Sequence, residues 1–241
     1  MIVSSTPSSA TARPRSARRF GRAAALTTVT LAATLTSVAS IALTEASPVA
    51  ASPAIAPEMA TNALADQITM AAAEAVTSLE AYDQSGNPAD AQDLAWHRAI
   101  AARYTAQQLG YDELQMVTAW SDAPLGHQRA LLGALTQIGV PYRTNTSKPG
   151  VGFDCSGLTT YAWAGAGVEL YRQSGSQINE AAPLTREHAK AGDLVHYPGH
   201  IMMYLGVGDA IIHSITHGRT VEVDTISERR RNTVRWGDPT A

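Results

Sequence analysis

The spacing of apolar residues changes along the chain, and this change restricts the possible fold more than any other feature. From residue 52 to about residue 121, apolar side chains recur at three- and four-residue steps, which is typical of amphipathic helices. Beyond Leu170 the pattern becomes a short alternation broken by glycine-containing turns, which is typical of antiparallel strands. A helical part followed by a β-meander predicts an α+β fold.

The helical part, residues 52–121, predicts a hairpin or spacer. A first helix is broken at residues 83–88, a second ends near Gly110, and a third covers residues 112–120. The apolar face of the second helix comprises Trp96, Ile100 and Tyr104. These faces are mostly alanine and contain no set of catalytic groups. We expect His97, and His127 in the following helix, to be solvated.

Residues 122–241 form the predicted α+β domain. One helix begins after Pro124 and ends at Gly139, and another begins at Cys155 and ends near residue 165. The predicted strands cover residues 193–197, 200–205, 210–214, 220–224 and 233–236. We expect His188 and His196 to lie at the surface or at an edge of this sheet.

The N-terminus is typical of an export signal. An uncharged run over residues 23–44 follows a basic segment with five arginines, and small residues precede a plausible cleavage point after Ala51. A membrane anchor is the alternative, because the uncharged run approaches the length of a transmembrane helix. The threonines and serines within the run favour cleavage. We therefore predict residues 1–51 to be removed, and the protein to be secreted and associated with the cell wall without stable membrane insertion.

Charge and cysteine content exclude several classes of protein. The whole chain has a net charge of −3, and loss of residues 1–51 removes five basic residues and one acidic residue, leaving about −7. An acidic protein is a poor candidate for binding nucleic acid. The single cysteine, Cys155, excludes an intramolecular disulfide and any multi-cysteine metal site. We expect a monomer without a cofactor.

Cys155 has the surroundings of a catalytic nucleophile. Asp154 is a suitable N-cap, so Cys155 lies in the first turn of a helix, where a negative charge is stabilised. The alternative is a small buried apolar residue, which is the usual role of a free cysteine. His200 opens a predicted strand and His213 lies near the end of the next strand, so a tight hairpin would bring both to one end of the sheet. We predict that His200 is the base and that His213 orients its ring.

Zinc binding is a rival explanation for the histidines. The pairs His196/His200 and His213/His217 have the spacing of ligands on a helix. However, a Pro-Gly turn interrupts the first pair, and four residues on a strand span about 13 Å, too far for one ion. The second pair has no acidic residue close to it in the sequence. We therefore predict no metal site.

The residues around Cys155 and the two histidines resemble the NlpC-type family of bacterial cell-wall cysteine peptidases, a papain-like group. The resemblance covers about residues 125–236 and includes five motifs in the family's order. These motifs occupy residues 139–142, 152–158, 170–177, 191–194, and 200–206 with 212–213.

The resemblance implies a papain-like fold, with the catalytic helix packed on the sheet, and an endopeptidase that cleaves peptidoglycan stem peptides. The bond would be that between D-γ-glutamate and the following diamino acid. It implies that Tyr142 and the backbone N–H of Cys155 face the oxyanion. It also implies that Asp154 and Ser156 line the substrate subsite, although Asp154 could serve only as a helix cap. A further motif, Arg172, Ser174 and Gln177, favours a structural role.

Three departures from the family pattern affect the loop and the cleft more than the catalytic groups. Tyr171 stands where proline is common, Met202 replaces a small residue, and the interval between His200 and His213 is one residue longer than usual. Two other functions stay open. One is a peptidoglycan-binding or scaffolding protein with weak or blocked catalysis, and the other is acyl transfer to a lipid or small molecule.

Overall fold

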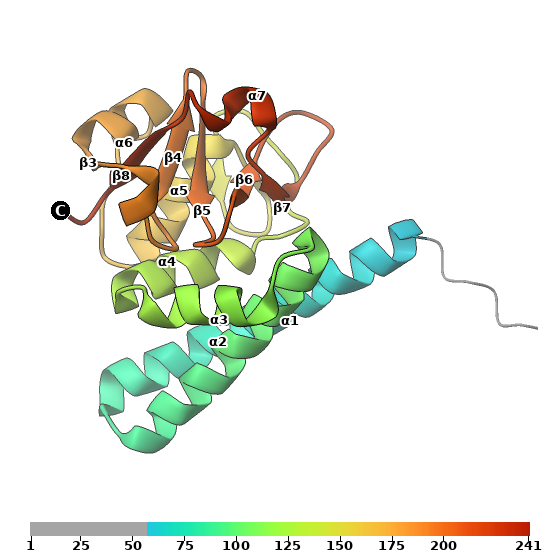
Figure 1. Cartoon of the computed structure of the whole chain (residues 1–241), viewed down its shortest axis with the longest axis vertical. Helices are drawn as coiled ribbons and strands as arrows, with labels where there is room; N and C mark the ends of the chain where they lie inside the picture. Colours follow the sequence, from blue (N-terminus) through green and yellow to red (C-terminus); the bar gives the residue numbers. More distant parts are fainter. Residues whose placement is uncertain (1–56) are drawn as a thin grey trace, which may run out of the picture. The chain divides into compact units, whose positions relative to one another are not determined.

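A computed structural model describes residues 57–241, and the predicted export signal lies outside the described residues. The described part begins with four helices (Figure 1): α1 (Pro57–Ser85), α2 (Pro88–Leu109), α3 (Glu113–Asp122) and α4 (Leu125–Leu135). The predicted break between the first two helices is confirmed. Asn87 caps α2 by accepting hydrogen bonds from the backbone N–H groups of Ala89 and Asp90, and Pro88 occupies the first turn.

The helices pack through small residues. α1 lies along α2 and also contacts α4, and α3 packs against α2. Buried alanines let the helix backbones approach closely: Ala72, Ala75, Ala101, Ala102 and Ala106. Ser52–Ala241 form one compact unit, and the boundary expected at residue 121 falls in the last turn of α3. Trp120 is fully buried there, and its Nε1 donates a hydrogen bond to the carbonyl of Leu205 at 2.8 Å.

The C-terminal part is built on a six-stranded antiparallel sheet in the order β3-β8-β4-β5-β6-β7, and β1 and β2 form a separate two-stranded pair. The strands are β1 (Ser147–Lys148), β2 (Gly152–Phe153), β3 (Ala182–Leu184), β4 (Leu194–Tyr197), β5 (His200–Tyr204), β6 (Ala210–Ser214), β7 (Val221–Thr225) and β8 (Arg235–Asp238). The remaining helices are α5 (Cys155–Gly165), α6 (Ser174–Glu180), the 3-10 turn η1 (Arg186–His188) and α7 (Glu228–Arg231). The expected α+β architecture is confirmed.

The two faces of the sheet carry separate apolar clusters. One face packs on α5 and the helical part, through residues such as Ile201, Met203 and Ile212. The other face carries a smaller cluster that includes Met202, Tyr204 and Ile211. Alternation along β5 therefore places His200 on the same face as Met202 and Tyr204, as the sequence predicts. Within residues 57–241, no helix is both long enough and apolar enough to cross a membrane.

Three expectations about individual side chains are wrong. His127 is buried, because its side chain contacts Trp163 of α5 and lies beside Gly192, just before β4, and its Nε2 donates to Asp193 at 3.0 Å. His196 is buried because β8 pairs with the outer side of β4, so β4 is an internal strand. Trp96 points to solvent with 61% of its surface exposed. His97 is half-buried and hydrogen-bonded to Ser78 at 2.8 Å, whereas His188 is exposed, as expected.

Candidate active site

Cys155 is the first residue of α5, and the chain around it is tightly constrained. The Asp154 side chain caps the helix by accepting a hydrogen bond from the backbone N–H of Gly157 at 2.7 Å. The backbone N–H of Asp154 donates to the Thr146 carbonyl at 3.0 Å. A Cβ at Gly157 would lie 2.1 Å from that same carbonyl oxygen, so only glycine fits there. The thiol of Cys155 is partly exposed at this helix end.

His200 and His213 lie together at one end of the sheet. β5 and β6 are antiparallel, and the turn between them packs against the helical part, where a Cβ on Gly208 would contact Tyr111. The opposite ends of the two strands carry the histidines. His200 Nε2 and His213 Nδ1 are 3.1 Å apart, and both residues are about 95% buried, at 5% and 4% exposure. The predicted proximity of the two imidazoles is confirmed.

The buried position of His200 controls its protonation. Burial lowers the pKa of His200 from 6.5 to about 3, and the neighbouring charges of His213 and His196 act in the same direction. The imidazole is therefore neutral near pH 7, which is the form that can accept a proton.

Tyr197 links the histidine pair to the cysteine. It is the strand partner of His200 across the β4–β5 turn, and the two ring centroids are 5.2 Å apart. Burial raises the pKa of the Tyr197 hydroxyl; the Arg230 charge opposes this change, and the charge of Cys155 adds to it. Ser214, next to His213 on β6, donates a hydrogen bond to the carbonyl of Phe153 at 2.8 Å, so the segment before Cys155 lies at the end of the sheet that carries the histidines.

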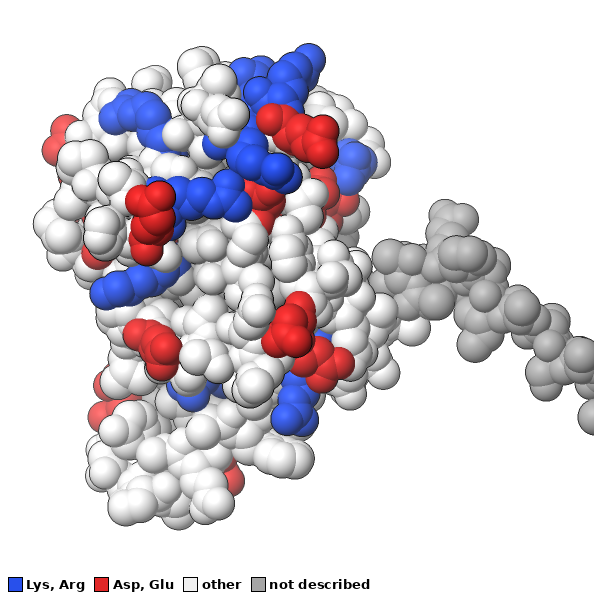
Figure 2. All heavy atoms as spheres, in the orientation of Figure 1, with Lys and Arg blue, Asp and Glu red and all other residues white. Residues whose placement is uncertain are grey.

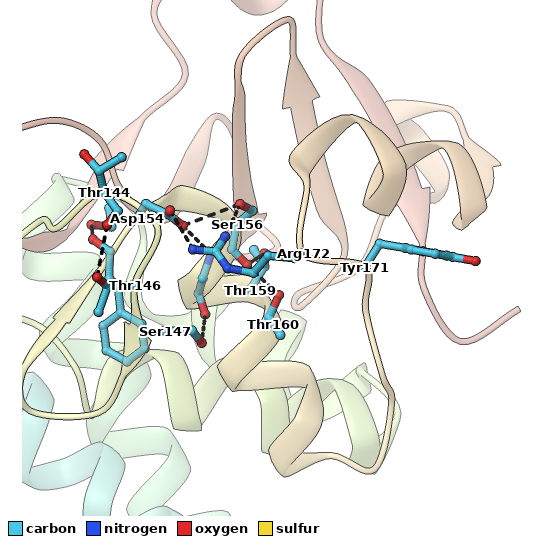
Figure 3. Close-up of polar contacts among 12 residues, drawn as sticks. Thr144, Thr146, Ser147, Asp154, Ser156, Thr159, Thr160, Tyr171 and Arg172 are labelled. Atoms are coloured by element: carbon cyan, nitrogen blue, oxygen red, sulfur yellow. Dashed lines mark hydrogen bonds and ion pairs between the residues drawn. The ribbon is translucent and has the colours of Figure 1, made fainter.

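Arg172 joins the two residues on either side of Cys155. Its guanidinium donates to Asp154 Oδ2 at 2.7 Å and to Ser156 Oγ at 2.8 Å. Figure 3 shows the guanidinium between these two side chains, whereas Tyr171 points away from them. The helix-capping role of Asp154 is confirmed. One of its carboxylate oxygens caps α5, and the other accepts a hydrogen bond from Arg172.

The other residues of the Arg172 motif differ in what they do. Gln177 is buried and donates to the carbonyls of Tyr171 at 2.7 Å and Ser156 at 3.1 Å, so it fixes the loop after α5. This confirms its structural role. Ser174 is the first residue of α6.

Tyr142 lies beside the start of the catalytic helix. It forms an isolated parallel β-bridge with Phe153, two residues before Cys155. Its ring is 5.0 Å from that of His217, whose Nε2 is 3.1 Å from Thr144 Oγ1. His217 is therefore in contact with the Tyr142 loop rather than with His213.

A cavity of about 230 Å³ opens beside the histidine pair. Its lining includes Tyr197, Met202, His213, Asp224, Arg229 and Arg230. The Arg230 guanidinium stacks on the Tyr197 ring at 4.4 Å. In Figure 2, basic side chains gather at the end of the molecule where Figure 1 shows α7. Met202 thus borders the cavity, as expected for a residue that narrows the cleft.

Two acidic residues near His213 were not foreseen from the sequence. His213 Nε2 is 3.5 Å from Glu222 Oε1 and 3.7 Å from Asp224 Oδ2, so the expectation of no acidic group nearby is wrong. The reason is the β6–β7 hairpin, which makes His213 and Glu222 direct strand partners. The predicted strands 210–214 and 220–224 contained this signal, because a hairpin centred on residues 217–218 between them pairs residue 213 with residue 222.

Two groups of side chains have a spacing that would suit a cation. They are His127 with Asp193 and Asp238, and His213 with Glu222 and Asp224. In the first group, Asp193 is already hydrogen-bonded to His127. In the second, Arg219 forms an ion pair with Glu222 at 2.6 Å, and this positive charge opposes a bound cation. We interpret both groups as hydrogen-bonding clusters.

Comparison with known proteins gives a family model and several relatives that match part of the chain. The NlpC/P60 family model matches residues 139–237. The peptidoglycan endopeptidase RipB of Mycobacterium tuberculosis is 39% identical over 100 residues, which cover 35% of this chain and 42% of RipB. The murein DD-endopeptidase MepH of Escherichia coli is 35% identical over 104 residues, covering 39% of this chain and 38% of MepH. The chain thus spans less than half the length of these relatives.

Similar structures include RipD of Mycobacterium tuberculosis, described as a non-catalytic NlpC/p60 domain protein adapted to peptidoglycan binding. RipD is 27% identical, with a TM-score of 0.40, and the match covers 48% of this chain and 98% of RipD. The family match includes Cys155, His200 and His213 and covers most of the C-terminal part. Residues 139–237 therefore match the NlpC/P60 family, the family that the sequence motifs resemble.

Proposed function

We propose that this protein is a peptidoglycan endopeptidase that hydrolyses stem peptides with Cys155 as its nucleophile. The observation that carries the proposal is the 3.1 Å contact between His200 Nε2 and His213 Nδ1, at the end of the sheet where Ser214 is hydrogen-bonded to the segment just before Cys155. A thiol next to a neutral, oriented imidazole is the arrangement that acyl transfer requires. Relatives with endopeptidase names support the substrate class.

The chemistry follows from the order of the three side chains. His200 accepts the thiol proton, and the Cys155 sulfur attacks the carbonyl carbon of the scissile amide. The C–N bond breaks when His200 returns the proton to the leaving amine. Water, deprotonated by His200, then attacks the thioester, which releases the new carboxylate and restores the thiol. The backbone N–H of Cys155 and the hydroxyl of Tyr142 stabilise the oxyanion.

The substrate is held on both sides of Cys155. Asp154 and Ser156, bridged by Arg172, line the subsite before the scissile bond. On the α7 side, Arg229 and Arg230 border the cavity next to His213. Stem peptides carry free carboxylates, which guanidinium groups bind well. These local positive charges matter because the predicted mature protein has a net charge near −7.

Product analysis tests this proposal. Purified peptidoglycan is incubated with the protein, and the soluble fragments are identified by mass spectrometry. We expect fragments produced by cleavage between D-γ-glutamate and the diamino acid. Peptidoglycan that binds the protein without release of fragments would instead indicate a binding or scaffolding protein. Cleavage at a different bond would agree with a peptidoglycan hydrolase but would contradict the proposed cleavage site.

We also propose that the protein acts outside the cytoplasm as a monomer after removal of residues 1–51. The basic segment and uncharged run of the N-terminus support export. N-terminal sequencing of the protein from a culture medium or wall fraction should begin at Ser52. Recovery in the membrane fraction with residues 1–51 still attached would contradict cleavage.

A further inference from the structure

The pair His200–His213 can exist in two neutral hydrogen-bonded forms, and only one of them supports catalysis. In the first, His200 Nε2–H donates to His213 Nδ1, and His200 Nδ1 stays free to accept the thiol proton. In the second, His213 Nδ1–H donates to His200 Nε2, and the remaining proton of His200 lies on Nδ1. The 3.1 Å contact permits both forms. Another group must therefore favour one of the two forms.

The side chain that can favour one of these two forms is Glu222 on β7. In the first form His213 carries its proton on Nε2, and in the second this atom presents a lone pair. His213 Nε2 is 3.5 Å from Glu222 Oε1, and this histidine nitrogen is buried without an aligned hydrogen bond to any described group, whereas the carboxylate oxygen is also 2.6 Å from Arg219 Nη2. An unsatisfied buried polar atom costs about 1–3 kcal/mol, so a small closure that gives His213 Nε2 this carboxylate as its partner is favourable. A carboxylate can only accept, and therefore it favours the form with a proton on Nε2.

Glu222 is held as a carboxylate in this position. Burial tends to raise its pKa, but hydrogen bonds with His213 and Arg219 outweigh this and keep the pKa below its usual value. Arg219 contacts the carboxylate with two nitrogens, Nη2 at 2.6 Å and Nε at 3.2 Å. Asp224 is the other acidic group that faces His213, but it is 3.7 Å away and 44% exposed, so its influence is weaker.

We infer that Glu222 is a positioning residue that fixes the tautomer of His213, and through it leaves His200 Nδ1 free to act as the base for Cys155. The chain of contacts runs Arg219–Glu222–His213–His200. This role requires no contact of Glu222 with the substrate or with the thiol. This inference rests on the proposed function, because it assigns to the His200 base a group that controls its proton.

The test combines kinetics with a tautomer measurement. Glu222→Gln keeps the size of the side chain, but its amide can donate to His213 Nε2 and so allows the unproductive form. On a defined stem peptide ending in γ-D-glutamyl-diaminopimelate, we expect kcat to fall about 10- to 100-fold, with KM changed less than about threefold. Glu222→Asp should recover part of the lost kcat. The matched control is Glu228→Gln, an exposed carboxylate on α7, which should keep the kcat of the parent protein.

Nitrogen-15 NMR of the imidazoles supplies a readout that a purely structural role would not change. In the parent protein His200 Nδ1 should be unprotonated, and in Glu222→Gln a protonated Nδ1 population should appear. A kcat within twofold of the parent, or the same His200 tautomer in both proteins, would overturn the inference. If the parent protein hydrolyses no stem peptide, the proposed function fails, and the tautomer comparison still decides the role of Glu222.

Discussion

Protonation of His200 should make the protein less stable in mild acid. In the folded state the pKa of His200 is lowered to about 3, whereas in the unfolded chain the imidazole returns to about 6.5. Between these values the unfolded state binds a proton that the folded state does not. The free energy of unfolding therefore falls as the pH is lowered below 6.5. Each pH unit in this window removes about 1.4 kcal/mol, so a change from pH 7.5 to 5.0 removes about 2 kcal/mol.

The assay is urea unfolding at pH 7.5 and pH 5.0 for the parent protein and for His200→Gln. The variant lacks the titrating group, so its stability should fall by about 2 kcal/mol less than that of the parent over the same interval. Contributions from groups that do not interact with His200 are the same in both proteins and cancel in this comparison. His188→Gln, at an exposed histidine, should retain the full pH dependence of the parent. Equal losses in the parent and in His200→Gln would refute the reasoning.

Two further predictions concern the first turn of α5 and the cavity beside α7. Gly157→Ala places a Cβ 2.1 Å from the Thr146 carbonyl oxygen and should lower the free energy of unfolding by roughly 1–3 kcal/mol. In the control Gly165→Ala, in the same helix, the new Cβ meets no atom within 4 Å and should not destabilise the protein. Urea unfolding measures both variants, and equal stabilities would contradict this packing. Arg229→Glu should raise KM for an anionic stem peptide about tenfold with kcat nearly unchanged. The control Arg103→Glu, on α2, makes the same charge change away from the site and should leave KM unaltered. A similar KM in the two variants would show that Arg229 does not contact the substrate.

Local patterns predicted most of the fold. The strands from residue 194 to residue 225 begin and end within one residue of their expected positions, because alternation and glycine turns are short-range signals. The proximity of His200 and His213 could also be predicted, because consecutive strands joined by a short turn are neighbours in the sheet. Cys155 at the start of a helix required only its N-cap, Asp154.

The errors arose where distant segments meet. Nothing near His196 indicates that β8 pairs with β4, so its burial depended on a contact with the C-terminus of the chain. The local sequence around His127 is typical of a surface position, and its partner Asp193 lies 66 residues further along the chain. Glu222 is different, because the register of the β6–β7 hairpin could have indicated it.

The central claim is that Cys155 performs the hydrolysis, and the release of soluble fragments from purified peptidoglycan tests it most directly. The rates for the parent protein and Cys155→Ala are compared after circular dichroism has shown that both are folded. The account predicts steady release by the parent protein and none above background by the variant. Release by Cys155→Ala at a rate close to that of the parent would contradict it.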